Sequence, residues 1–123
     1  MAPRDLRERT RLFALAVRNF CRRLPSTPEA KEAAAQLRRA ANSVRSNYRA
    51  SRKGRSRAEF EAKLGTVAEE ADECVDWLEY LRDTKIRHDE ALLDEADQLT
   101  RIFVTAVKTA KKNTNRLKNL PKS

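Results

Sequence analysis

Glycine and proline are scarce in this chain, with two and four occurrences among 123 residues, and most of them lie where helices would end. Pro25 and Pro28 lie within the stretch LPSTPE, and Gly54 interrupts the apolar pattern between two long segments. Few residues therefore break helices inside those segments. A chain of this length forms one domain with a single core, so a second function would share surface with the first.

Residues that assemble catalytic or metal sites are also few. The only histidine, His88, lies in a predicted loop or at the start of the last helix. The acidic run EEADE places Glu70 and Glu73 on one helix face, but di-metal bundles pair such residues with Glu-x-x-His on other helices. No such motif, Gly-rich phosphate loop or Ser-His-Asp set is present. The sequence therefore predicts no enzyme activity, no cofactor and no metal.

Long apolar runs are absent as well. The amino terminus, MAPRDLRERTR, is charged throughout and precedes no such run, which predicts neither a signal peptide nor a membrane span. We therefore expect a cytoplasmic protein without a membrane partner. The two cysteines, Cys21 and Cys74, fall on apolar faces of predicted helices, and we expect buried, reduced thiols instead of a disulfide.

Amphipathic periodicity predicts four helices and a frayed basic tail. The helices cover residues 4–24, 27–53, 57–83 and 88–115, and the tail covers 116–123. From Phe60 to Leu81, apolar residues of the third helix alternate steps of four and three, the seam expected of left-handed bundle packing. Because short connections make neighbouring helices antiparallel, the sequence predicts an all-α, up-down four-helix bundle.

Helix starts and side-chain sizes refine this prediction. Ser26 with Glu29, and Ser56 with Glu59, form capping-box patterns at the starts of the second and third helices. The second helix has unusually small apolar residues, through which a neighbour can approach its backbone closely. These are Ala30, Ala33, Ala34, Ala40 and Ala41.

The charge is strongly polarised along the chain. The excess of 27 Lys and Arg over 18 Asp and Glu gives +9, which favours polyanionic partners. Residues 37–57 hold eight cations and 98–123 hold seven, in both cases without an acid. Residues 58–83 hold nine acids and two cations. Because solvated helix faces usually mix the two signs, the acid-free block between residues 37 and 57 suggests a binding surface.

Two interpretations of this polarity compete. In the first, arginine forks of the second helix and the following bend bind phosphates. In the second, cations of the second helix pair with acids of the third, within a subunit or between subunits. The predicted nucleic-acid-binding residues are Arg38, Arg45, Arg49, Arg52, Lys53, Arg55 and Arg57. The residues predicted for an oligomer or partner interface are Asn47, Tyr48, Glu70, Glu73 and Trp77.

The segment QLRRAANSVRSNYRASRKGRSRAEFEAKLG, followed by EEADECVDWLEYL, resembles the bacterial four-helix bundle proteins of the 23S rRNA intervening-sequence type, also called the ribosomal protein S23 family. This resemblance implies a short up-down bundle that assembles into a ring, commonly a pentamer, with a basic surface for nucleic acid. It also implies kinship with the accessory variability proteins of diversity-generating retroelements, which bind a reverse transcriptase and its RNA.

Two functional hypotheses follow from residues and resemblance together. The first is a non-enzymatic homo-oligomer that binds nucleic acid, RNA rather than DNA, through phosphate contacts with little sequence readout. The alternative is an accessory adaptor that docks onto a reverse transcriptase and its RNA by charge complementarity. A third possibility is that the polarity serves self-assembly alone.

Overall fold

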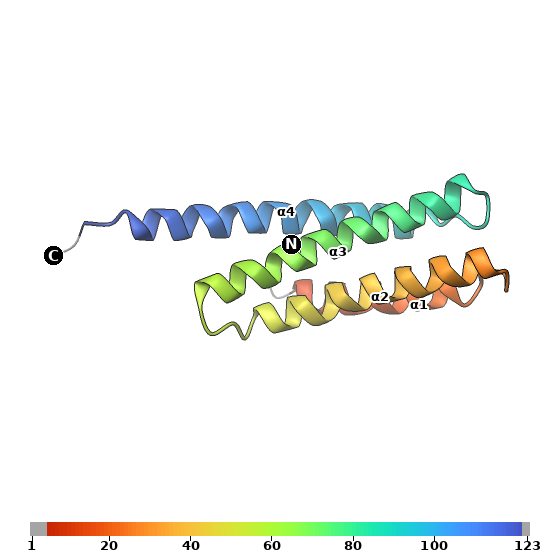
Figure 1. The fold of residues 1–123 in the computed structure, drawn as a ribbon, viewed down its shortest axis with the longest axis horizontal. Coiled ribbons are helices and arrows are strands. Elements are labelled where there is room, and N and C mark those ends of the chain that lie inside the picture. Colours follow the sequence, from red (N-terminus) through yellow and green to blue (C-terminus); the bar gives the residue numbers. More distant parts are fainter. Residues whose placement is uncertain (1–4, 122–123) are drawn as a thin grey trace.

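Four helices make up the protein in the computed structural model, which describes residues 5–121 (Figure 1). They are α1 (Asp5–Cys21), α2 (Pro28–Ser51), α3 (Arg57–Asp83) and α4 (Glu90–Lys118). Short connections make successive helices antiparallel, and the most extensive packing joins α2 to α3 and α3 to α4. The all-α four-helix bundle is thus confirmed, whereas the ring stays a prediction.

Side-chain caps fix where the helices begin. Ser56 accepts a hydrogen bond from the Glu59 amide at 3.1 Å, as its sequence pattern predicts. The predicted Ser26 cap is wrong by one residue, because Thr27 accepts from the Ala30 amide at 3.2 Å. Pro28 then occupies the first helical position, where its fixed φ suits the helix and its missing N–H leaves no bond unmade.

The helix ends differ from the predicted bounds by a few residues. α1 ends at Cys21 instead of 24, because Pro25 disfavours helical backbone at the preceding residue. α2 ends at Ser51, two residues early, and α4 runs from Glu90 into the predicted tail as far as Lys118. The cations of its last turn interact favourably with the negative end of the helix dipole. Residue 4, the predicted start of α1, and residues 122 and 123 of the tail lie outside the described part.

All four helices contribute to the core, and α2 contributes several small residues to it. Ala33 and Ala40 are fully buried, and their small side chains let the flanking helices approach the α2 backbone. Larger side chains fill the remaining space: Leu37 and Phe103 are also fully buried, and the Phe103 ring packs on Tyr48 with centroids 5.4 Å apart. The small residues of α2 are therefore buried at its contacts with other helices, as the sequence predicts.

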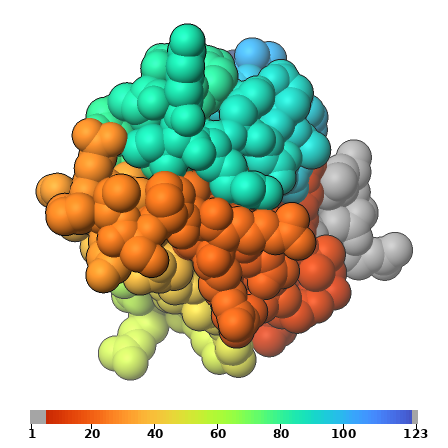
Figure 2. Space-filling view, turned by 90° about the vertical axis from the view of Figure 1, so that its right-hand side faces the viewer, coloured from red at the N-terminus to blue at the C-terminus, as the bar shows by residue number. Residues whose placement is uncertain are grey.

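The two connections at one end of the bundle cover its core there. Figure 2 looks at this end, with the α1–α2 connection in orange below the α3–α4 connection in teal. At the other end, α4 extends past the connection between α2 and α3 (Figure 1). Phe103 is the last buried residue of α4. Within the described residues, no helix combines the length and apolar character needed to cross a membrane.

Both cysteines are free and buried, as the sequence predicts. Burial raises the pKa of Cys21 to about 11, although the nearby Arg38 guanidinium opposes this shift. Burial also raises the pKa of Cys74, and the charges of Glu73 and Glu70 add to the effect. The folded state therefore holds the two thiol protons more tightly than the unfolded state does. The resulting contribution to the free energy of unfolding is complete below about pH 9 and declines as the pH rises toward 11.

We expect both thiols to resist an aromatic disulfide reagent near neutral pH. At pH of about 8, the raised pKa of Cys21 lowers its thiolate fraction about 10²-fold relative to an unfolded thiol, and burial slows access further. Absorbance should report slow modification of the native protein and fast modification of two thiols after denaturation. Fast modification of the native chain would contradict the buried placement.

Candidate nucleic-acid interface

Three arginines of α2, and the arginine directly after its last residue, share one face of that helix. Arg38, Arg45, Arg49 and Arg52 are separated by seven, four and three residues, spacings that return to the same side of a helix. At 1.5 Å per residue, this α2 arginine row is about 21 Å long. Arg45 is half-buried and the other three are exposed, so their guanidinium groups are accessible from one side of the bundle.

The α1 helix supplies two further arginines beside this row. Arg11 and Arg18 line a groove between α1 and α2 together with Arg38 and Arg45, and its volume is about 410 Å³. Ala14, Leu15 and Asn42 complete the lining of this α1–α2 groove. Because the two helices are antiparallel, Arg18 lies toward Arg38 and Arg11 toward Arg45. The groove thus gathers four cations and no acid from two segments of the chain.

None of the seven predicted nucleic-acid-binding residues forms an ion pair with any part of the chain that the structure describes. In the groove, only Arg11 is paired, with Glu8 of its own helix at 2.6 Å. Both side chains of that pair are more than half exposed, so the bond contributes little. The positive field of the α1–α2 groove is therefore almost uncompensated.

The bend between α2 and α3 continues the positive surface. Arg52, Arg55 and Arg57 line an open hollow of about 590 Å³, and Lys53 is exposed beside them. Gly54 permits this tight connection, since a Cβ atom at its position would lie 3.3 Å from the Ser51 carbonyl oxygen. The predicted block therefore divides into a row along α2 and a cluster at the bend.

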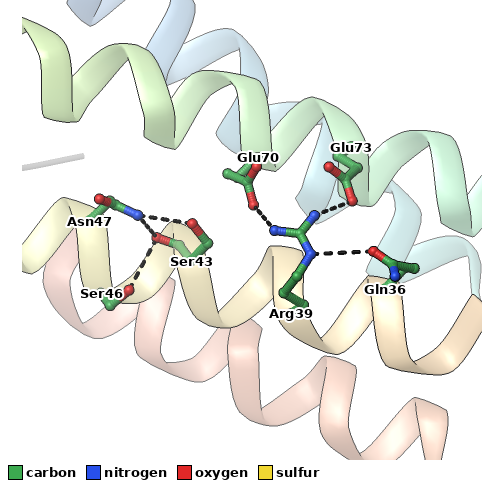
Figure 3. A network of polar contacts seen from close by, with 7 residues as sticks. All are labelled: Gln36, Arg39, Ser43, Ser46, Asn47, Glu70 and Glu73. Carbon is green, nitrogen blue, oxygen red and sulfur yellow. Dashed lines mark hydrogen bonds and ion pairs between the residues drawn. The ribbon is translucent and has the colours of Figure 1, made fainter.

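Arg39 is the exception within the basic stretch, because it faces α3 (Figure 3). Its guanidinium donates to Glu70 at 2.8 Å and to Glu73, and its Nε donates to Gln36 at 3.3 Å. These bonds raise the pKa of Arg39 further. The interpretation that cations of α2 pair with acids of α3 is thus correct for Arg39, and the arginines on the α1 side of α2 are left unpaired.

The residues predicted for an interface differ in burial and in their contacts. Tyr48 is 4% exposed and packs on Phe103, so as an accessible contact it is wrong: its position on the inner face of α2 places it in the core. Asn47 donates to the backbone oxygen and the hydroxyl of Ser43, at 3.0 and 2.8 Å (Figure 3). Trp77 is half-buried at the edge of the core.

The remaining candidates for chemistry lie apart from the groove. His88 precedes α4 and contacts Glu90 at 2.8 Å, while Asp89 caps the helix by accepting from the Leu92 amide at 3.0 Å. Among the residues described, no three side chains of the metal-ligating types come together. The basic groove and bend are therefore the features of this surface with the clearest binding chemistry.

Comparisons with known proteins agree on one family. The family model described as "23S rRNA-intervening sequence protein" matches residues 5–115. A solved structure of a protein of unknown function from the S23 ribosomal protein family of Bacteroides thetaiotaomicron superposes with a TM-score of 0.77 at 24% identity. The similarity covers 84% of this chain and 98% of that one, and at this identity it supports the fold alone. No curated protein matches the chain.

Proposed function

The chain belongs to the 23S rRNA-intervening sequence protein family, and from this premise we propose that it is a non-enzymatic, self-associating protein that binds RNA. The ligand surface is the α1–α2 groove together with the bend at residues 52–57. The observation that carries the proposal is that two helices bring four arginines to one groove without an acid in its lining. The family's name connects it with 23S rRNA, which favours RNA over DNA as the ligand.

The chemistry of this surface suits a sugar–phosphate backbone. Guanidinium groups bind phosphate oxygens through two parallel hydrogen bonds and stack on exposed bases. Ala14 and Leu15 supply apolar area beside the cations, and Asn42 supplies an amide. Phosphate contacts of this kind position the ligand and carry little sequence information, so the proposed binding is strongly salt-dependent and weakly selective.

The proposal is tested by the salt dependence of RNA binding. Replacing Arg49, Arg52 and Arg55 by Ala should make the negative slope of log affinity against log salt shallower by about 2, because each phosphate contact contributes roughly −0.7 to −0.9 to that slope. Fluorescence anisotropy of a labelled, structured RNA measures this slope. Helical content by circular dichroism should stay unchanged, since all three side chains are exposed.

A matched variant removes three cations from another helix. Lys108, Lys111 and Lys112 are exposed on α4, and their replacement by Ala changes the net charge equally. Its slope should stay near that of the wild type; a larger effect here than at the bend would contradict the proposed surface. Light scattering at low and high salt measures the size of the oligomer, and so separates a loss of RNA binding from a loss of self-association. An oligomer whose size does not change when RNA is added would favour a protein partner.

A further inference from the structure

The basic surface beside α2 extends along the whole of that helix. Four cations recur at intervals of seven residues and therefore lie on one side of it. They are Lys31, Arg38, Arg45 and Arg52. At 1.5 Å per residue, they span about 30 Å between the α1–α2 connection and the bend after α2 (Figure 1). None of the four forms an ion pair with the described part of the chain.

Three hollows in the surface follow these cations. Between the end of α1 and the start of α2, Ser26, Lys31 and Arg38 line a hollow of about 310 Å³ with their neighbours. Arg38 also lines the α1–α2 groove, so these two hollows adjoin. The hollow at the bend begins at Ser51 and Arg52. No acid lines any of the three, and we call them together the α2 track.

The width of the α2 track suits one nucleic-acid strand better than two. The axes of packed helices lie about 8–10 Å apart, which sets the scale of the groove between α1 and α2. A duplex is much wider, because its major groove alone, about 12 Å across in B-form DNA, admits a whole α-helix. A duplex would therefore rest on the edges of the groove, whereas a single strand can enter it between the arginines of α1 and those of α2.

The middle of the α1–α2 groove offers contacts for a base. Arginines line the groove on both helices, and Leu15 and Asn42 lie between them in the sequence of each helix. Leu15 is 44% exposed, so its methyl groups can contact the face of a base. The amide of Asn42 can both donate to and accept from a base edge. The face of a base is accessible in this way only where the strand is unpaired and unstacked.

An aromatic ring at the end of the α2 track favours the same form of RNA. Phe60 lines the hollow at the bend together with Arg52, Arg55 and Arg57. Its side chain is half-buried and packs against the core, which holds the ring in place beside the hollow. Aromatic rings within basic grooves stack on the bases of single strands, whereas a duplex encloses its base faces within its own stack.

We propose that the α2 track binds single-stranded RNA, with the strand running along α2 and one base stacked on Phe60. This inference rests on the proposed function, because it specifies which form of RNA the same surface binds. A strand with stacked bases has one phosphate per about 3.4 Å, so the track accommodates about nine nucleotides. Duplex RNA binds more weakly, through the phosphates of its outer surface alone.

Two labelled RNAs test the proposal on the full chain. One is a single strand of 12 uridines, which exceeds the length of the track, and the other is a duplex of 12 base pairs. Although the duplex carries more charge, the single strand should bind about tenfold more tightly in fluorescence anisotropy, because only its bases can stack on the protein. Equal or tighter binding of the duplex would overturn this inference and leave RNA binding itself standing. Binding of neither RNA would overturn the proposed function as well.

Variants of Phe60 test the stacking contact. Phe60→Leu keeps an apolar side chain against the core but removes the ring, and it should weaken binding of the single strand at least about fivefold. Its affinity for the duplex should stay near that of the wild type. Phe60→Tyr keeps the ring and should retain the affinity for the single strand. No loss in Phe60→Leu, or equal losses with both RNAs, would overturn the inference.

A matched control removes an aromatic ring outside the α2 track. Tyr80 is 37% exposed on α3 and lines none of the three hollows. Tyr80→Leu should therefore bind both RNAs as the wild type does. Circular dichroism of each variant checks that the helical content is unchanged. A loss of single-strand binding in Tyr80→Leu that equals the loss in Phe60→Leu would overturn the placement of the base at the bend.

Discussion

Replacing Arg38 and Arg45 by glutamate is expected to weaken RNA binding by about 10³-fold at a salt concentration near 0.1 M. Each substitution removes a phosphate contact and adds a repelling charge, and the release of counterions contributes roughly a factor of eight per charge under these conditions. Both residues line the α1–α2 groove, where they form no ion pair within the described chain. Anisotropy of a labelled RNA, titrated at fixed salt, measures the loss.

The control places the same charge change on a different helix. Lys111 and Lys112 are exposed on α4, and their replacement by glutamate lowers the net charge by the same amount. If the groove is the binding surface, the RNA affinity of this variant should fall by about tenfold or less, because only the overall positive field of the protein is weaker. A loss in the control that matches the groove variant would assign the affinity to general charge or to the end of α4.

Phe103→Ala should lower the free energy of unfolding by about 3–5 kcal/mol, the cost of removing a large ring from a packed core. Phe103 is 0% exposed and packs on Tyr48 at 5.4 Å, with the ring planes tilted by 54°. It is also the last buried residue of α4, so its loss weakens the contact that anchors the second half of that helix. For a chain of this size, the midpoint of thermal unfolding should fall by about 10–20 °C.

The neighbouring residue gives a matched control. Val104 is 40% exposed, and Val104→Ala should change stability by no more than about 0.5 kcal/mol. Circular dichroism during heating measures both variants, at one protein concentration because self-association would shift the midpoint. Similar midpoints for the two variants would show that Phe103 is not part of the core.

Predictions from the sequence were correct where a pattern within one helix is compatible with a single structure. The seam from Phe60 to Leu81 is periodic over the whole of α3, and a stripe of this kind must be buried in a bundle. The Ser56 cap is likewise local, since its hydroxyl bonds an amide three residues away. The Ser26 cap was wrong because two capping residues, Ser26 and Thr27, stand side by side before Pro28, and only the folded backbone selects one of them.

The arrangement of the basic residues was predicted only in part. The acid-free arginine block is visible in the sequence, but its division into Arg39, which pairs with α3, and the row beside α1 depends on which helix lies on each side of α2. The α1 arginines were missed. Arg11 and Arg18 do recur at a helical spacing, yet only packing against α2 brings them into one groove with Arg38.

The sequence by itself determined the helical class, the number of helices, the buried thiols and the polarity of charge, because composition and periodicity act within one helix. The tertiary structure alone decided which charges cancel. Coulomb interactions depend on distance across helices, and that distance follows from packing of Ala33, Ala40 and their neighbours around α2. The basic groove beside α1 and the ion pairs of Arg39 with α3 both result from that packing.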